Sequence, residues 1–229
     1  MNEQKLESER HHEAGSELLR PLGPVEGCTR AEFLFKVAVG GAALLASLGT
    51  PKSAAARRSN DVEILRFDLT FEYLQAHFYT EGLAVGGLTN ETRDWARVVG
   101  AHERAHVRIL RSVLGKASVK RPFLDYHGVT EDEEAFTRTA VAMEDLTTAL
   151  LTGQIPHLSS PELVSAAFSL LTVEARHAAW VRHRRGLVPT AAAFDRPRSI
   201  SEVNRLVAST HFMRSDPKTY AKVRPRFTG

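Results

Sequence analysis

Apolar residues recur at alternating spacings of three and four along four stretches of this chain, and that period predicts amphipathic α-helices. The stretches cover residues 60–82, 90–114, 130–152 and 160–186. A shorter amphipathic stretch covers residues 199–210. The pattern therefore predicts an all-α fold made of four long helices and a short C-terminal helix.

Residues typical of helix ends flank these stretches. Ser160 followed by Pro161 is the arrangement of an N-cap and a first helical residue, and glycines at 115 and 153 are expected to end the second and third helices. The other starts carry capping residues, three of them with a glutamate three positions later, as in a capping box. These N-caps are Asn60, Thr89, Thr130 and Ser199.

The connections between the four long helices are short, long and short. Residues 115–130 lack a helical period and contain Pro122. Fully extended at about 3.3 Å per residue, this segment could run about 50 Å, which exceeds a 25-residue helix at about 1.5 Å per residue. We therefore expect a four-helix bundle with one long crossover between helices 2 and 3.

Two of the four helices carry the motif Glu-x-x-His on their apolar stripes. Glu103 and His106 form the first copy, and Glu174 and His177 form the second. Residues three positions apart lie on the same face of a helix. Each of these helices is therefore expected to present one carboxylate and one imidazole toward the core.

Each motif follows another core-facing glutamate at nearly the same distance. Thirty residues separate Glu72 from Glu103, and twenty-nine separate Glu144 from Glu174. The midpoint of each pair falls in the connecting turn, so folding each hairpin brings its two glutamates to the same height. The candidate site is therefore an internal repeat.

Four carboxylates in a core are unfavourable unless they are neutralised, because an unpaired buried carboxylate costs roughly several kcal/mol or retains its proton. A pair of divalent metal ions would neutralise them. Carboxylate and imidazole ligands favour iron or manganese over copper(I) or a structural zinc, and Cys28 is the only cysteine. We expect two iron ions, with two manganese ions as the alternative.

Each of these residues also has a plainer interpretation. A single Glu-x-x-His pair is most often solvated, Glu72 could pair with an arginine, and Glu144 with Asp145 could belong to an acidic surface. His77 and His102 fall off the inward stripes and are expected at the surface. Three arginines are expected to form a solvated end of the fourth helix, favourable to its dipole: Arg182, Arg184 and Arg185.

The N-terminal part of the chain differs from the helical region. Residues 1–28 are polar and are expected to form a flexible extension. Residues 29–56 are similar to an export signal, with the basic segment TRAEFLFK, an apolar run and a small-residue cleavage site ending at Ala56. TRAEFLFK resembles a twin-arginine signal, although Ala31 follows Arg30. The alternative is a core helix rich in alanine and glycine.

Cleavage after Ala56 would leave a mature protein outside the cytoplasm, with the bundle in residues 57–212 and a basic tail in residues 213–229. The apolar run is too short for a stable transmembrane anchor, which needs about 20 apolar residues. The chain has 229 residues, 43% hydrophobic and 25% charged, which suits one globular domain. Its 30 basic and 27 acidic residues are interspersed, which argues against a nucleic-acid partner.

Over residues 60–186 the pattern resembles the ferritin-like di-iron carboxylate superfamily, whose sites take a Glu from two helices and a Glu-x-x-His from two others. DVEILRFDLTFEYLQAHFYTEGL, HERAHVRIL and LTVEARHAAWVR, followed by AFDRPRSISEV, are similar to a bacterial ferritin-like domain family that includes desiccation-related proteins. Members are often exported. Tyr79 matches the near-site tyrosine of ferritins and bacterioferritins, which implies a redox role; core packing is its plainer interpretation.

Three functions are compatible with these features. The first is a ferroxidase or a di-iron enzyme that activates dioxygen or peroxide. The second is dimanganese, catalase-like removal of peroxide on the same ligands. The third is a structural stress protein that keeps the bundle and either lacks metal or uses it only for stability. The sequence marks no surface for self-assembly and leaves a homo-oligomer open.

Overall fold

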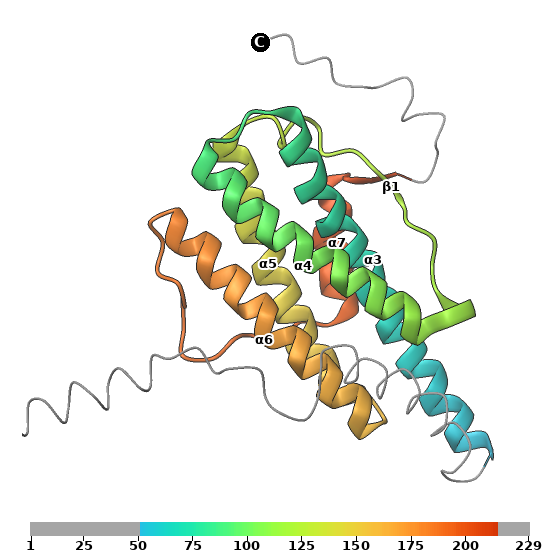
Figure 1. Ribbon diagram of the computed structural model, residues 1–229. Helices are drawn as coiled ribbons and strands as arrows, with labels where there is room; N and C mark the ends of the chain where they lie inside the picture. The colour runs from blue at the N-terminus through green and yellow to red at the C-terminus, as the bar shows by residue number, and fades with distance from the viewer. Residues whose placement is uncertain (1–50, 215–229) are drawn as a thin grey trace, which may run out of the picture. The chain divides into compact units, whose positions relative to one another are not determined.

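The computed structural model describes residues 51–214, with side chains from residue 59 onward. Four long helices form a bundle (Figure 1): α3 (Pro51–Val85), α4 (Asn90–Leu114), α5 (Glu133–Gln154) and α6 (Pro161–Arg184). α3 packs along α4, and α5 packs along α6, so each pair adjacent in sequence is a helical hairpin. The predicted all-α bundle with a single long crossover is confirmed.

Several helix ends follow their local capping signals. The hydroxyl of Thr89 accepts a hydrogen bond from the backbone N–H of Thr92 at the start of α4, which ends at the predicted Gly115. α6 begins after Ser160 with Pro161 in its first turn. Ser199 forms the predicted capping box at the start of α7 (Ile200–Thr210). These predictions depended only on contacts three residues apart, and they are confirmed.

Two predicted helix starts are wrong. α3 does not begin at Asn60, because the chain is already helical from Pro51, and the Asn60 side chain donates to the backbone oxygen of His157 at 3.0 Å. α5 begins after Asp132, whose carboxylate accepts from the N–H of Ala135 at 2.7 Å. Thr130 is not the cap, and its hydroxyl is used elsewhere in a hydrogen bond to a carboxylate of α3.

The predicted end of α5 at Gly153 is also wrong, since the helix continues to Gln154. A Cβ atom at position 153 would lie 2.2 Å from the backbone oxygen of Arg198. Glycine is therefore required here because the returning chain passes directly over the helix. Gly153 therefore marks a close contact between two chain segments and not the end of a helix.

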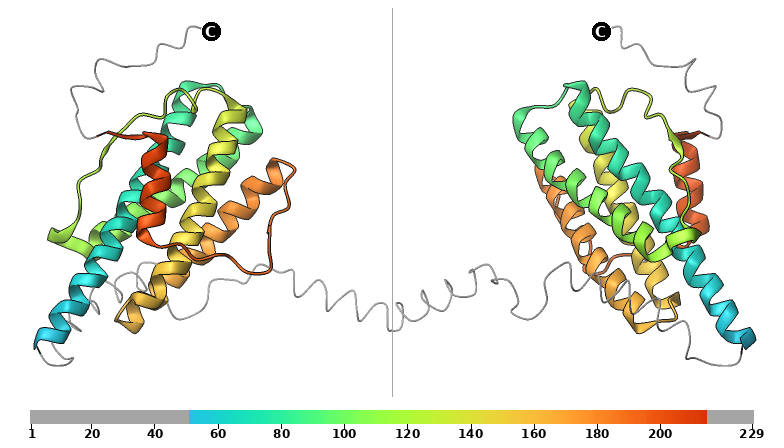
Figure 2. Two further views of the ribbon diagram at one scale, coloured as in Figure 1. Left: turned by 180° about the vertical axis from the view of Figure 1, so that it is seen from behind. Right: turned by 45° about the vertical axis from the view of Figure 1, so that its right-hand side comes forward.

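The crossover runs between the two hairpins and includes two short elements that the helical pattern did not predict. A 3-10 turn covers Gly115–Ala117, and strand β1 (Phe123–Leu124) pairs antiparallel with β2 (Met213–Arg214). Figure 2 shows α7 lying along the outside of α3 and α5. Val203 and Val207 of α7 are buried in the main core. The C-terminal helix is thus part of the bundle domain.

The core consists of two clusters along the bundle. The larger contains an aromatic group in which Phe78 stacks on Phe136 with ring centroids 4.5 Å apart, and Tyr79 and Trp95 belong to the same cluster. The smaller is mainly aliphatic, with Leu65, Leu69, Tyr73, Leu110 and Leu114 at its centre. On α4, Glu103 and His106 lie in sequence between Val99 of the larger cluster and Leu110 of the smaller one.

Several predictions fall outside the part of the chain that the structure describes. These are the N-terminal extension, residues 29–50 of the export signal, and residues 215–229 of the basic tail. Within residues 51–214, no helix is both long enough and apolar enough to cross a membrane.

Candidate metal centre

The structure brings together all six residues that the sequence predicts as metal ligands. Glu72 comes from α3, Glu144 from α5, and one Glu-x-x-His pair comes from each of α4 and α6. All four glutamates have no exposed surface. The side chains of His106 and His177 are 14% and 3% exposed. The matched heights expected from the repeat are therefore observed.

His106 faces three carboxylates through its Nδ1 atom. This nitrogen lies 2.9 Å from Oε1 of Glu174, 3.4 Å from Oε2 of Glu72 and 3.6 Å from Oε2 of Glu103. Ligand atoms from these four residues all lie within 4.8 Å of one another. They form the first of two groups that could hold a metal ion.

His177 faces a second, overlapping group in the same way. Its Nδ1 atom lies 3.0 Å from Oε1 of Glu103, 3.5 Å from Oε2 of Glu144 and 3.5 Å from Oε2 of Glu174. Glu103 and Glu174 belong to both groups, and each turns one oxygen toward each imidazole. The two motif glutamates therefore face both groups, whereas Glu72 and Glu144 each belong to one group.

Most of these atoms lack a hydrogen-bond partner despite the short separations. Both oxygens of Glu72, Glu103 and Glu174, one oxygen of Glu144, and Nδ1 of both histidines are buried and make no hydrogen bond of acceptable geometry. Unsatisfied polar atoms of this kind are rare in protein cores and unfavourable. Bound metal cations would satisfy them, so the residues present fit a metal site of carboxylate and imidazole ligands.

Without metal, Glu72 and Glu144, which each belong to only one of the two groups, are held in their neutral form. Burial raises the pKa of Glu144 to about 8, with the charges of Glu103 and Glu174 adding to the effect. Burial likewise raises the pKa of Glu72 well above its usual range, again with the charge of Glu103 contributing. Both carboxyls therefore retain a proton near neutral pH.

The imidazoles behave in the opposite way. Burial alone would lower the pKa of His106 and His177, but the surrounding carboxylates raise both, that of His177 to about 12. Burial would raise the pKa of Glu103, yet its contacts with the two imidazoles lower it to about 2. Protons thus occupy the centre when metal does not, and a metal ion must displace them.

Tyr79 touches the centre from the aromatic side of the core. Its buried hydroxyl donates a hydrogen bond to Oε1 of Glu144, and burial together with the charge of Glu144 raises its pKa well above the usual range. A Cβ atom at Gly100 would lie 2.7 Å from Cβ of Tyr79, so this glycine lets α4 pass close to the ring. Tyr79 therefore contacts the cluster through Glu144, one of the candidate ligands.

Two further residues near the centre were not predicted as site residues. His102 is exposed, as expected, but its Nδ1 atom lies 2.9 Å from Nε2 of His177. Asp68 is buried one turn before Glu72, with one oxygen lacking a hydrogen bond. Burial, together with the charges of Glu174 and Glu103, raises the pKa of Asp68 to about 7. Its spacing of four from Glu72 is a signal that could have identified it.

The predicted solvated end of α6 is wrong, because its arginines join the helices together. Arg182 binds both oxygens of Asp145 on α5, at 2.9 and 2.7 Å. Arg184 lies 2.8 Å from a carboxylate oxygen of Glu91 on α4. His77, also expected at the surface, is only partly exposed and packs against Tyr126 with ring centroids 5.7 Å apart.

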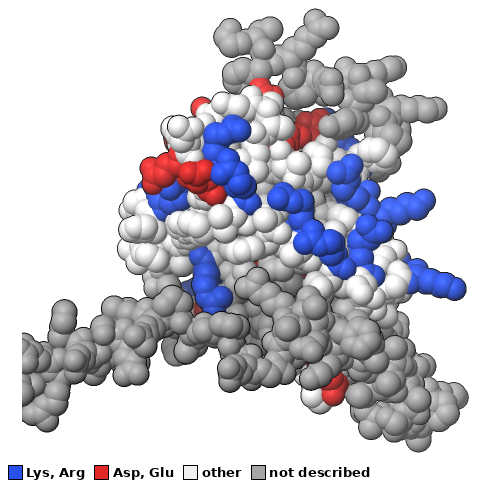
Figure 3. All heavy atoms as spheres, viewed as in Figure 1, with Lys and Arg blue, Asp and Glu red and all other residues white. Residues whose placement is uncertain are grey.

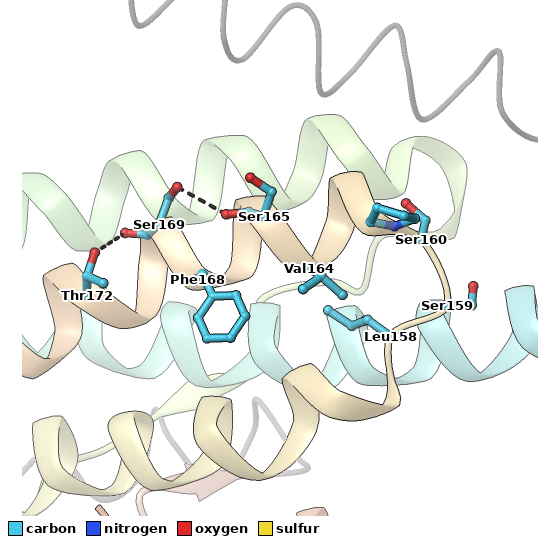
Figure 4. A pocket seen from close by; sticks show the side chains of 9 residues that line it. Leu158, Ser159, Ser160, Val164, Ser165, Phe168, Ser169 and Thr172 are labelled. Atoms are coloured by element: carbon cyan, nitrogen blue, oxygen red, sulfur yellow. Dashed lines mark hydrogen bonds between the residues drawn. The ribbon is translucent and has the colours of Figure 1, made fainter. Parts of the chain in front are cut away.

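A surface hollow of about 700 Å³ lies on the outer face of α6 (Figure 4). None of the six cluster residues is among the described residues that line it. Among the described residues that line it, none carries a carboxylate or an imidazole. The hydroxyls of Ser169 and Thr172 donate to backbone oxygens of the same helix. The described lining therefore does not form a second cluster of the metal-binding type.

The charged surface is less evenly mixed than the composition suggests. Between the buried Glu103 and Asp125 the sequence contains six basic residues and no acidic one. Figure 3 shows basic side chains gathered over the second half of α4 and the crossover, with acidic side chains elsewhere on that face.

Comparison with known proteins agrees with the architecture. No curated protein matches the sequence. A family model described as "Ferritin-like domain" matches residues 60–187, a stretch that covers more than half of the chain and contains every residue of the cluster. The match extends from the first hairpin to the end of the second, and on this basis the chain belongs to the ferritin-like domain family.

Proposed function

We propose that this protein binds two iron ions in the carboxylate cluster and uses them in ferroxidase chemistry or in the reduction of dioxygen or peroxide. The observation that carries the proposal is the pair of overlapping ligand groups that share Glu103 and Glu174. Each group adds one further carboxylate and one imidazole. Two ions would therefore be held by equivalent sets of residues, with Glu103 and Glu174 common to both sets.

The charges and ligand types support this assignment. Four carboxylates balance the formal charge of two divalent ions, and the neutral imidazoles add none. Oxygen and imidazole ligands suit iron and manganese. Two ferrous ions bound here would supply two electrons for the reduction of dioxygen or peroxide. The same ligands would also suit manganese, so the identity of the metal decides between the two chemistries.

The chain's own residues prepare the centre in three ways. Glu72 and Glu144 hold protons in the metal-free protein and release them when cations enter. Tyr79 orients Glu144 through its hydroxyl, and the redox role that we infer for Tyr79 depends on this contact. The four glutamates have no exposed surface, and their shielding from water strengthens the electrostatic interactions among them.

The test is anaerobic reconstitution of the purified protein with ferrous iron, followed by elemental analysis and exposure to oxygen. Two iron ions per chain, oxygen consumption and a ferric absorption band would support the proposal. Rapid peroxide disproportionation with manganese but not with iron would instead indicate the catalase-like activity. Absence of uptake for either metal would overturn both, and leave a structural role for the bundle.

Variants of a residue common to both groups and of a residue that belongs to one group make this test more specific. Glu103→Ala and His177→Ala are expected to lower the metal content, because each removes an atom from the ligand groups. Glu162→Ala, on the partly exposed first turn of α6, is the matched control and should retain two ions. Full metal content in Glu103→Ala would show that the ligand assignment is wrong.

Export is a second part of the proposal, and it rests on residues 29–56 alone. Cleavage after Ala56 would remove the first six residues of α3 and leave the contacts of Asn60 and Asp61 with the second hairpin intact. N-terminal sequencing of protein recovered from outside the cytoplasm tests this. A native protein that is found in the cytoplasm with Met1 retained would refute it.

A further inference from the structure

The imidazole of His102 lies against the imidazole of His177 on the outer side of the metal centre. Their rings are nearly parallel, with an interplanar angle of 15° and centroids 5.2 Å apart. Nδ1 of His102 lies 2.9 Å from Nε2 of His177. An exposed residue on α4 is thus in direct contact with a side chain of α6 that is 3% exposed.

The two nitrogens of His177 face different partners. Nδ1 points at the carboxylates and lies 3.0 Å from Glu103, whereas Nε2 points at His102. A neutral imidazole can offer a lone pair to a metal from only one nitrogen, and the other then carries the hydrogen. A metal on Nδ1 therefore requires a hydrogen on Nε2, and Nδ1 of His102 is the acceptor for that hydrogen.

We propose that His102 is a positioning residue for His177, which fixes the tautomer and the ring orientation needed for Nδ1 to bind metal. The inference rests on the proposed di-metal function. Metal-binding histidines commonly donate their second N–H to a carboxylate, a carbonyl or water, and loss of that partner typically lowers metal affinity by about 10- to 100-fold. Here the partner is a histidine at the surface.

The position of His102 restricts its effect to one half of the centre. It contacts His177, which belongs to the group with Glu144, and not to the group with Glu72. The ring of His106 is 6.3 Å from that of His177, measured between centroids. Removing the His102 imidazole is therefore expected to weaken the binding of one of the two metal ions and not of the other.

Anaerobic titration of the full-length protein with cobalt(II), followed by its visible absorption, tests this inference without measuring catalysis. Wild-type protein should bind two ions per chain. His102→Ala should bind one ion about 10- to 100-fold more weakly, with a changed spectrum for that ion only. His102→Asn should recover most of the affinity, because its side-chain oxygen can accept the hydrogen from Nε2. His183→Ala, at an exposed position of α6, is the matched control.

The outcomes separate this inference from the function on which it rests. Failure of the wild-type protein to bind cobalt, iron or manganese would overturn both. Two ions bound to His102→Ala with wild-type affinities and spectra would overturn the role of His102 and leave the di-metal centre intact. Equal weakening in His102→Ala and His102→Asn would also overturn it, since ring packing and not hydrogen-bond acceptance would then matter.

Discussion

Replacing Glu144 by glutamine removes one buried carboxylate while keeping the size of the side chain and the oxygen that accepts the Tyr79 hydroxyl. In the metal-free protein this carboxyl is held neutral by burial and by the nearby charges of Glu103 and Glu174. Glutamine resembles that neutral form at every pH. We therefore expect the variant to lack a pH-dependent loss of stability that the wild-type protein shows.

The size of this effect follows from the two pKa values of Glu144. The folded-state pKa is about 8, and the ordinary value is 4.5. Between these values the folded state binds more protons than the unfolded state, so the free energy of unfolding falls as the pH rises. At about 1.36 kcal/mol per pKa unit, the penalty is about 1 kcal/mol at pH 5 and about 4 kcal/mol at pH 8.

Urea unfolding in the presence of a chelator, at pH 5 and at pH 8, measures this difference. Any constant cost of placing an amide beside His177 cancels between the two pH values. The wild-type protein is therefore expected to lose about 3 kcal/mol relative to Glu144→Gln over this range. Glu63→Gln changes an exposed carboxylate on α3 and should show no comparable difference.

Parallel stability profiles for wild type and Glu144→Gln would refute the reasoning, because Glu144 would then be ionised or solvated in the metal-free core. Ferrous iron added without oxygen should reverse the order of stability. Ligand that binds only the folded state stabilises it by RT ln(1 + [L]/Kd). The variant lacks one charged ligand, so its gain should be smaller than that of the wild type.

Three further predictions follow from the same contacts. Tyr79→Phe leaves a buried oxygen of Glu144 without its donor and should lower the free energy of unfolding by about 1 to 3 kcal/mol, while elemental analysis still finds two metal ions per chain. Metal affinity should rise with pH between 6 and 8, about tenfold per pH unit for each displaced proton, which calorimetry in buffers of different ionisation enthalpy can count. Gly153→Ala should destabilise the fold by about 1 to 3 kcal/mol, because its Cβ would meet the backbone oxygen of Arg198; a urea midpoint equal to that of wild type would contradict this.

Within each hairpin, the grouping of a buried glutamate with a Glu-x-x-His pair is predictable from the sequence because it depends on helix geometry. A spacing of three places Glu103 beside His106 whatever surrounds the helix. Equal distances from each glutamate to its turn set the heights within a hairpin, since every helical residue adds the same rise. The ends of α4 are predictable for a similar reason, because Thr89 and Gly115 act on the adjacent turn only.

Contacts between hairpins are not predictable in this way. His102 lies off the inward stripe of α4, yet it meets His177 because α6 lies along that flank. Arg184 lies off the stripe of α6 and meets Glu91 for the same reason. The period of one helix shows which face is buried but not which neighbour lies to either side. The pairing of β1 with β2 is equally non-local, since it joins the crossover to the chain beyond α7.

The internal repeat makes the two candidate metal-binding groups alike in residue type, but their surroundings differ. In one half, Glu144 is held by Tyr79 and His177 is held by His102. In the other half, the pKa of the buried Asp68 is raised to about 7, so this additional acid also retains a proton below that pH. Ligands that are already held in place lose less conformational freedom when an ion binds. We therefore expect the first ion to bind in the group that contains Glu144, so that a metal titration gives two distinguishable affinities. Two sites of equal affinity would show that the repeated ligand set, and not its surroundings, determines the order of metal binding.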